Sequence, residues 1–256
     1  MKPPQDFRAL DCGECAKGVD LGFDFTMAFQ PIVNVVTREI FAHEALVRGP
    51  LNEPSGHVFA QVNQGNRYRF DQSCRVKAVQ LAAELQVPCF LSINFMPNAI
   101  YQPELCIRTT LQAATTYRFP VERIIFEITE SEKVDDVPHL REIVQHYKQR
   151  GFLTAIDDFG AGYAGLNLLA DVQPNIVKLD MALIRNIDAD AGRRAITKGI
   201  LQVCADLSMQ VIAEGIETRG ELEVLSDLGV EFFQGHYFAR PAFRALAEVP
   251  GSQYLA

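Results

Sequence analysis

Residues 152–157 read FLTAID, a short apolar run that ends in an acidic residue. The same pattern stands on either side of it, in RIIFEI at 123–128 and in NIVKLD at 175–180. Runs of similar length are CFLSIN at 89–94, MQVIAE at 209–214 and EFFQG at 231–235. Runs of this length are typical of strands that are buried on both faces of a parallel sheet.

The segments between these runs include amphipathic patterns that predict helices, for example over 131–150 and 191–207. Strands that alternate with helices imply parallel pairing through crossover connections. Two earlier runs, at 25–33 and 38–48, are separated only by 34–37, which is too short for a crossover helix and predicts an antiparallel pair. The sequence therefore predicts an α/β fold, a modified TIM-like (β/α) barrel with an antiparallel first strand. We place this domain at 23–256, after a polar lead-in segment at 1–22.

Polar residues lie near the end of each predicted strand. They are Asn94, Glu127, Asp157, Asp158, Lys178, Glu214 and Gln234. Because the carboxyl ends of the strands of such a barrel meet at one face, these side chains should converge on one cavity, and Glu44 of an early strand should join them. Each acid taken alone could instead cap a helix or face solvent. The recurrence on strand after strand favours a common site.

Several carboxylates brought together in apolar surroundings repel one another unless a cation is present. A ligand set of carboxylates and an amide, without Cys or His, suits hard cations such as Mg²⁺ or Mn²⁺ better than zinc. We therefore expect a divalent metal site at the open end of the barrel.

The composition excludes several classes of protein. The formal net charge of −8 argues against a broad electrostatic surface for polymeric nucleic acid. The apolar runs are far shorter than a membrane span, and the N-terminal MKPPQDF lacks the apolar stretch of a secretory signal. We expect a soluble cytoplasmic protein that does not contact a membrane.

The cysteines and histidines show no metal-ligand pattern of their own. Cys12 and Cys15 form a CxxC, but no second pair accompanies them, so an incidental surface pair is the preferred interpretation and metal or redox use the alternative. The other four cysteines stand among apolar neighbours and should be reduced core residues. The five histidines are expected on the surface or in packing, with His236 the one neighbour of the site.

Taken in order, these residues form motifs that resemble the EAL-domain family of bacterial cyclic di-GMP phosphodiesterases, over residues 25–241. The name motif stands as Glu44-Ala45-Leu46, followed by Val47 and Arg48. The remaining motifs are FQPIV at 29–33, IN-x-x-P at 93–97, ExTE at 127–130, DDFGxGY at 157–163, KxD at 178–180, AEGxE at 213–217, and QG at 234–235 with F-x-RP at 238–241.

The resemblance implies a role for each matching position. Glu44, Asn94, Glu127 and Asp157 would bind one metal ion, Asp157 and Asp158 a second, and Glu214 would bind that second ion or activate water. Lys178 would contact the attacking water or the phosphate, and Gln234 would support the site. Glu130 would anchor the loop 158–166, Arg48 would contact phosphate, and Gln30 and Pro97 would lie near the nucleotide.

The implied reaction is hydrolysis of cyclic di-GMP to linear pGpG with two Mg²⁺ or Mn²⁺ ions, in a homodimer by family analogy. Two such ions supply a hydroxide near neutral pH and neutralise charge on the phosphate. Lys178 fits the role of a point charge better than that of a base, since neighbouring anions raise the pKa of a lysine.

The sequence departs from the family pattern at Gly49, Met96, Ala164–Gly165 and His236, none of which is an implied metal ligand. Gly49 and Met96 are expected to weaken nucleotide contacts, and Ala164 and Gly165 to loosen the loop. Two alternative functions stay open. One is a receptor or protein-binding module of the same fold without catalysis, and the other is a different barrel metalloenzyme acting on a small phosphorylated substrate.

Overall fold

The computed structural model describes residues 21–100, 102–129, 136–162 and 165–254. Its nine strands belong to one sheet. They are β1 (Thr26–Asn34), β2 (Glu39–Arg48), β3 (Phe90–Phe95), β4 (Ile124–Thr129), β5 (Leu153–Phe159), β6 (Ile176–Leu179), β7 (Gln210–Ala213), β8 (Phe232–Phe233) and β9 (Ala242–Phe243). The order runs from β2 through β8 to β1, and β1 also pairs with β2, so eight strands close a barrel and β9 is bonded to β1 outside it.

The strand directions agree with those predicted from the sequence. β1 is antiparallel to both of its barrel neighbours, β2 and β8, whereas β2 through β8 pair in parallel. The predicted TIM-like barrel with an antiparallel first strand is thereby confirmed. The short strand β9 was not predicted, and β8 is shorter than the run at 231–235 suggested.

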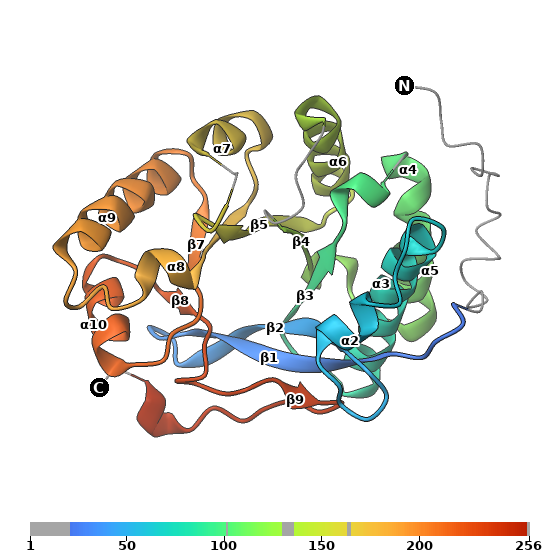
Figure 1. Cartoon of the computed structure of the whole chain (residues 1–256), viewed down its shortest axis with the longest axis horizontal. Helices are drawn as coiled ribbons and strands as arrows, with labels where there is room; N and C mark the ends of the chain where they lie inside the picture. The colour runs from blue at the N-terminus through green and yellow to red at the C-terminus, as the bar shows by residue number, and fades with distance from the viewer. Residues whose placement is uncertain (1–20, 101, 130–135, 163–164, 255–256) are drawn as a thin grey trace.

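Helices lie outside the strands (Figure 1). They are α2 (Ser55–Phe59), α3 (Arg67–Glu84), α4 (Pro103–Cys106), α5 (Arg108–Tyr117), α6 (Val137–Gln149), α7 (Leu166–Val172), α8 (Met181–Ile184), α9 (Ala191–Asp206) and α10 (Arg219–Asp227). The predicted helix over 191–207 is confirmed as α9. The helix predicted over 131–150 corresponds to α6 in its described part, because residues 130–135 lie outside the described residues. No helix among the described residues is long and apolar enough to cross a membrane.

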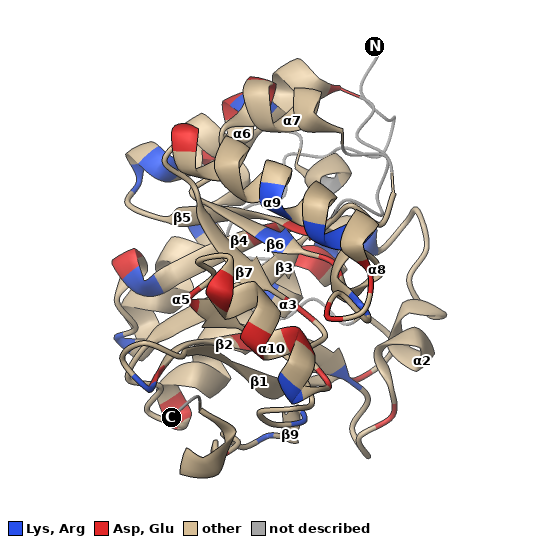
Figure 2. Ribbon diagram, turned by 90° about the vertical axis from the view of Figure 1, so that its left-hand side faces the viewer, with Lys and Arg blue, Asp and Glu red and all other residues tan. Residues whose placement is uncertain are grey.

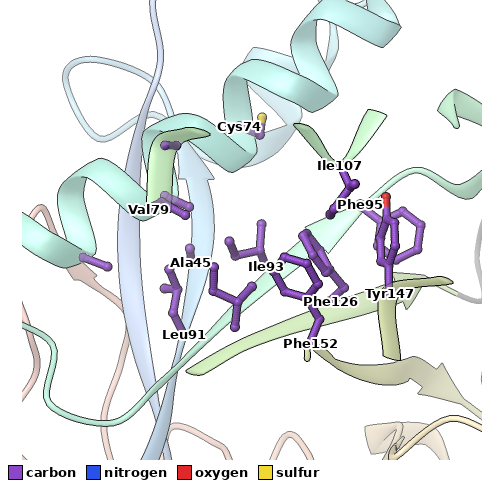
Figure 3. Close-up of a cluster of buried hydrophobic side chains, with 14 of the residues drawn as sticks. Ala45, Cys74, Val79, Leu91, Ile93, Phe95, Ile107, Phe126, Tyr147 and Phe152 are labelled. Atoms are coloured by element: carbon purple, nitrogen blue, oxygen red, sulfur yellow. The ribbon is translucent and has the colours of Figure 1, made fainter. Parts of the chain in front are cut away.

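Two apolar clusters fill the space between barrel and helices. The larger one packs α3, α5 and α6 against β3 and β4, with an aromatic group of Phe95, Phe126, Tyr147 and Phe152 whose ring centroids are 4.9–6.0 Å apart (Figure 3). The second packs α7 to α10 against β5 to β8. Contacts at these separations bury large apolar surfaces and fix the helices on the barrel.

A third cluster closes the inside of the barrel and explains where the polar residues point. Its buried members are Ile32, Ala42, Ile125, Ala155, Ile176 and Ile212. Successive side chains of a strand point to opposite faces, so a residue two positions away points inward as well. Toward the open end of the barrel, this is the residue two positions later on the parallel strands and two positions earlier on the antiparallel β1. That position holds Gln30, Glu44, Glu127, Asp157, Lys178 and Glu214. The inside of the barrel is therefore apolar at one end and carries a ring of polar side chains at the other.

Candidate active site

The polar ring surrounds the amino group of Lys178. Its Nζ lies 2.8 Å from Glu127 Oε2, 2.9 Å from Asp157 Oδ1, 2.6 Å from Glu214 Oε1 and 3.5 Å from Glu44 Oε2. Lys178 and Glu127 are fully buried, at 1% and 0% exposure. The predicted convergence is confirmed for these five residues, of which four lie on different strands and Glu214 directly follows a fifth.

Amide side chains bind the carboxyl group of Glu44 from two sides. Asn94 Nδ2 donates to Glu44 Oε1 at 2.7 Å, and Gln234 Nε2 donates to Glu44 Oε2 at 2.7 Å. Gln234 Nε2 also lies 3.2 Å from Gln30 Oε1, and Gln30 Nε2 donates to the carbonyl of Ala239 at 3.2 Å. These bonds orient the Glu44 carboxylate toward the centre of the ring.

The carboxyl groups form two sets whose oxygens lie within 4.8 Å of one another. One set is Glu44, Glu127 and Asp157, and the other is Asp157, Asp158 and Glu214. Asp157 belongs to both. Each set has the spacing and the hard oxygen donors that divalent cations such as Mg²⁺ and Mn²⁺ require.

One unpartnered atom supports this fit. Asn94 Oδ1 is buried and has no hydrogen-bond partner among the described residues, whereas its Nδ2 is used on Glu44. A buried amide oxygen without a partner costs free energy unless a cation or water binds it. The residues present therefore fit a metal site.

The charge balance points the same way. Burial raises the pKa of Glu127 and of Glu214 well above the ordinary value, and the charges of the neighbouring carboxylates raise it further. The charge of Lys178 lowers the pKa of both groups but offsets these effects only in part. For Lys178, burial alone would lower the pKa, but Asp157, Glu127 and Glu214 together raise it well above its usual value. Lys178 is thus held as a cation, which agrees with the point-charge role inferred from the sequence.

Asp158, the residue after Asp157 of the ring, has a strained backbone conformation. Its φ is +55°, in the left-handed region that disfavours residues other than glycine, and its N–H donates to Asp157 Oδ1 at 3.0 Å. Burial, together with the charge of Asp157, raises its pKa to about 6. Strain of this kind is found where the surrounding structure holds a residue for function.

The ring opens into a cavity of about 820 Å³. The lining includes the predicted substrate contacts Gln30 and Arg48 and the possible neighbour His236. Met96 is among the described residues that line the cavity, whereas Pro97, which begins a 3₁₀ turn next to it, is not. Glu130, Cys12 and Cys15 and part of the loop 158–166 lie outside the described residues. Cys74, Cys89, Cys106 and Cys204 are free, and the first and last of these are buried.

Sequence reasoning missed several residues that support the site. Ser92 is fully buried on β3, and its Oγ donates to Glu127 Oε1 at 2.5 Å. Asp71 of α3 lines the cavity and accepts the backbone N–H of Met96 at 2.9 Å. Ser92 stands two positions before Asn94 on the same strand, which is a signal the pattern of strand ends could have given.

Comparisons with known proteins agree with this geometry. The family model described as EAL domain matches residues 20–241. Among solved structures, a standalone versatile EAL protein from Vibrio cholerae O395 in its c-di-GMP bound form has a TM-score of 0.88 and 59% identity, over 91% of this chain and 99% of that one. BlrP1 of Klebsiella pneumoniae, in a manganese and cyclic di-GMP complex, has a TM-score of 0.83 and 32% identity, over 88% of this chain and 58% of that one.

Two curated relatives come from Escherichia coli K12. The blue light- and temperature-regulated antirepressor BluF is 33% identical over 223 residues, which are 87% of this chain and 55% of BluF. The cyclic di-GMP phosphodiesterase PdeF is 31% identical over 150 residues, 59% of this chain and 20% of PdeF. The chain thus spans about half or less of the length of these relatives. With a barrel of this topology, a ring of carboxylates at its open end and a family match over most of its length, the chain belongs to the EAL domain family.

Proposed function

We propose that this site hydrolyses one phosphodiester bond of cyclic di-GMP and releases the linear dinucleotide pGpG. The observation that carries the proposal is the double set of carboxylates around Lys178, with Asp157 common to both sets. The Vibrio cholerae protein, which this chain covers almost entirely, has a structure in a c-di-GMP bound form. PdeF is named a phosphodiesterase for the same messenger.

We assign two divalent cations to the two sets. Glu44, Asn94, Glu127 and Asp157 would hold one ion, and Asp157, Asp158 and Glu214 the other. Mg²⁺ or Mn²⁺ suits this donor set, and the solved structure of BlrP1 is a complex with manganese and cyclic di-GMP. Two such ions make water a stronger nucleophile and neutralise charge on a phosphate.

The chain's own residues supply orientation and charge. Lys178 stays protonated among the carboxylates and offers a fixed positive charge toward a phosphate oxygen. Gln234 and Asn94 hold Glu44 in place by the bonds described above. Glu214 lines the cavity with a side chain that is 14% exposed, and it would accept a proton from water there. Arg48 and Gln30 line the cavity, where Arg48 would contact the phosphate and Gln30 would lie near the nucleotide. Pro97 does not line the cavity but follows Met96, which does, and we propose that it too lies near the nucleotide.

The direct test is turnover. Purified protein with Mg²⁺ or Mn²⁺ should convert cyclic di-GMP to pGpG, and chromatography measures the pGpG formed. The Glu214→Ala variant should bind the nucleotide without turnover. Chelation of the metal should abolish the reaction in the wild type. Binding by the wild type with no pGpG formed in either metal would reject the proposal.

That negative result would favour the second candidate, a receptor or protein-binding module. BluF, which is named an antirepressor, gives this candidate its support. The complete set of carboxylates favours catalysis instead, because a receptor has no need to bury them around a lysine. A homodimer, a cytoplasmic location and the division into a lead-in segment at 1–22 and a barrel domain at 23–256 stay predictions.

A further inference from the structure

A second buried carboxylate lies outside the ring and holds two segments of the chain together. Glu221 of α10 is 1% exposed. Its Oε2 accepts the backbone N–H groups of Glu217 at 3.0 Å and Thr218 at 3.2 Å, and its Oε1 accepts the N–H of Asn186 at 3.2 Å. Glu221 therefore links the segment after α8 to the loop between β7 and α10. Figure 2 shows α8 and α10, with the acidic residues of α10 in red.

Arg185, the residue that follows α8, adds three bonds to the same link. Its Nη1 lies 3.2 Å from Glu221 Oε1 and 3.1 Å from Glu217 Oε2, and its Nη2 donates to the carbonyl of Gly215 at 3.2 Å. Gly215 directly follows Glu214, and Glu217 lines the cavity. The guanidinium reaches these three acceptors from two separate nitrogens, Nη1 and Nη2, whereas a lysine at this position would offer a single nitrogen.

The other end of α8 packs against the same loop. Gly215 has φ +68°, and a Cβ atom there would stand 2.6 Å from Met181 Cβ, so the first residue of α8 occupies the space beside it. The loop 214–218 is thus held at Gly215 by Met181 on one side and by Arg185 on the other. Asp180, which caps α8 through Ala182 N–H at 2.7 Å, ties that helix to the end of β6.

These contacts connect the two strands whose side chains meet at the reaction centre. β6 carries Lys178 and continues through Asp180 into α8 and Arg185. β7 ends just before Glu214, whose Oε1 is 2.6 Å from Lys178 Nζ. The contact between Lys178 and Glu214 connects β6 to the loop after β7 inside the barrel. The bonds of Arg185 connect the segment after β6 to the same loop nearer to solvent, where the Arg185 side chain is 27% exposed.

We propose that Arg185 is a positioning residue. It fixes the loop 214–218 against the segment that follows β6 and so keeps Glu214 within reach of Asp157 and Asp158. This inference rests on the proposed function for its kinetic consequence. Displacement of a reacting group by about 1 Å can cost about 100-fold in rate, and loss of an outer partner of a metal ligand costs about 10- to 100-fold in affinity or activity.

The kinetic experiment compares Arg185→Met and Arg185→Lys with Arg219→Met. The control removes an exposed ion pair on α10, Arg219–Glu223 at 2.7 Å, which does not touch the loop 214–218. Arg185→Met should lower kcat by about 10- to 100-fold, with KM changed by less than about threefold. Arg185→Lys should recover only part of the loss, because a single nitrogen cannot take the positions of both Nη1 and Nη2. Arg219→Met should match the wild type. Assays are run where circular dichroism shows every variant fully folded.

A second readout does not need turnover. Titration of the substrate-free proteins with Mn²⁺, followed by calorimetry, should show about tenfold weaker binding of one ion in Arg185→Met and none of this loss in Arg219→Met. If the wild type binds Mn²⁺ but forms no pGpG, the proposed function fails, and the Mn²⁺ comparison still decides the role of Arg185. Wild-type kcat and wild-type Mn²⁺ affinity in Arg185→Met would overturn it, as would full recovery of both by lysine.

Discussion

Lys178 Nζ and Glu214 Oε1 lie 2.6 Å apart, and both residues line the same cavity, Lys178 from β6 and Glu214 from the position directly after β7. The same ammonium is within 3 Å of Glu127 and Asp157. One protonated lysine therefore offsets part of the repulsion among several buried carboxylates. The proposed divalent cations would share this task with Lys178, so removal of one should increase the demand for the other.

Lys178→Met tests that relationship. Loss of one partner of a buried ionic cluster leaves uncompensated charge, so we expect the metal-free variant to lose about 3–5 kcal/mol of unfolding free energy. Mn²⁺ should raise its melting temperature by more than it raises that of the wild type. Lys198→Met, an exposed substitution on α9, serves as the control. An equal Mn²⁺ shift in all three proteins would contradict the shared role.

Ser92→Ala tests the support behind Glu127. Because Ser92 Oγ donates to Glu127 Oε1 in a fully buried position, its loss should leave that carboxylate less firmly oriented and lower Mn²⁺ affinity by about 10- to 100-fold. Ser226→Ala is the matched control, since the Ser226 hydroxyl is buried without a partner among the described residues. Calorimetric titration checks the prediction, and equal affinities in the two variants would refute it.

The ring of site residues could be predicted because it depends on strand ends. A run such as FLTAID fixes both the strand and the position of its acid, and a closed barrel brings all such positions together whatever the helices do. Glu44, Asn94, Glu127, Asp157, Asp158, Lys178, Glu214 and Gln234 were found in this way or through the family motifs that contain them. The roles assigned to them remain proposals.

The supporting contacts could not be predicted in the same way. Arg185 and Glu221 are 36 residues apart and meet through the path of two loops, which no periodicity in the sequence encodes. Gly49 is a similar case. The expectation of weaker nucleotide contacts there stays a prediction, and the structure adds a local reason for glycine. A Cβ atom at Gly49 would stand 2.3 Å from Glu53 Oε2, so glycine leaves room for a carboxylate that accepts the N–H of Leu51.

The pH dependence of stability should show the contribution of Glu221. Burial alone would raise its pKa, but the N–H groups of Glu217, Asn186 and Thr218 outweigh that effect and lower it. A carboxyl group with a lowered pKa stabilises the fold above its unfolded-state pKa of about 4.5, and this stability is lost as the pH falls through the folded-state value. Glu221→Gln should therefore be less stable than the wild type at pH 7, and the difference should shrink below about pH 4.5.

Urea unfolding at a series of pH values measures that difference. Glu223→Gln, on the exposed face of the same helix, is the control and should differ little from the wild type at any pH. A gap between Glu221→Gln and the wild type that stays constant from pH 7 to pH 3.5 would show that the charge of Glu221 does not contribute.

Arg75 is the largest fully buried side chain among the described residues, and Asp71 is the carboxylate that neutralises its charge. Its Nη2 lies 2.6 Å from Asp71 Oδ2, its Nη1 donates to Tyr147 Oη at 3.0 Å, and its guanidinium lies 5.2–5.3 Å from the rings of Phe95 and Phe126.

Arg75→Met would leave Asp71 buried without its cation, at an expected loss of about 3–5 kcal/mol of unfolding free energy. Asp71→Asn alone leaves the opposite charge uncompensated. The double variant removes both charges, so its loss should be smaller than the sum of the single losses by about 0.5–3 kcal/mol. Denaturant unfolding of the four proteins measures this coupling, and strictly additive losses would show that the pair is not the reason Arg75 is tolerated in the core.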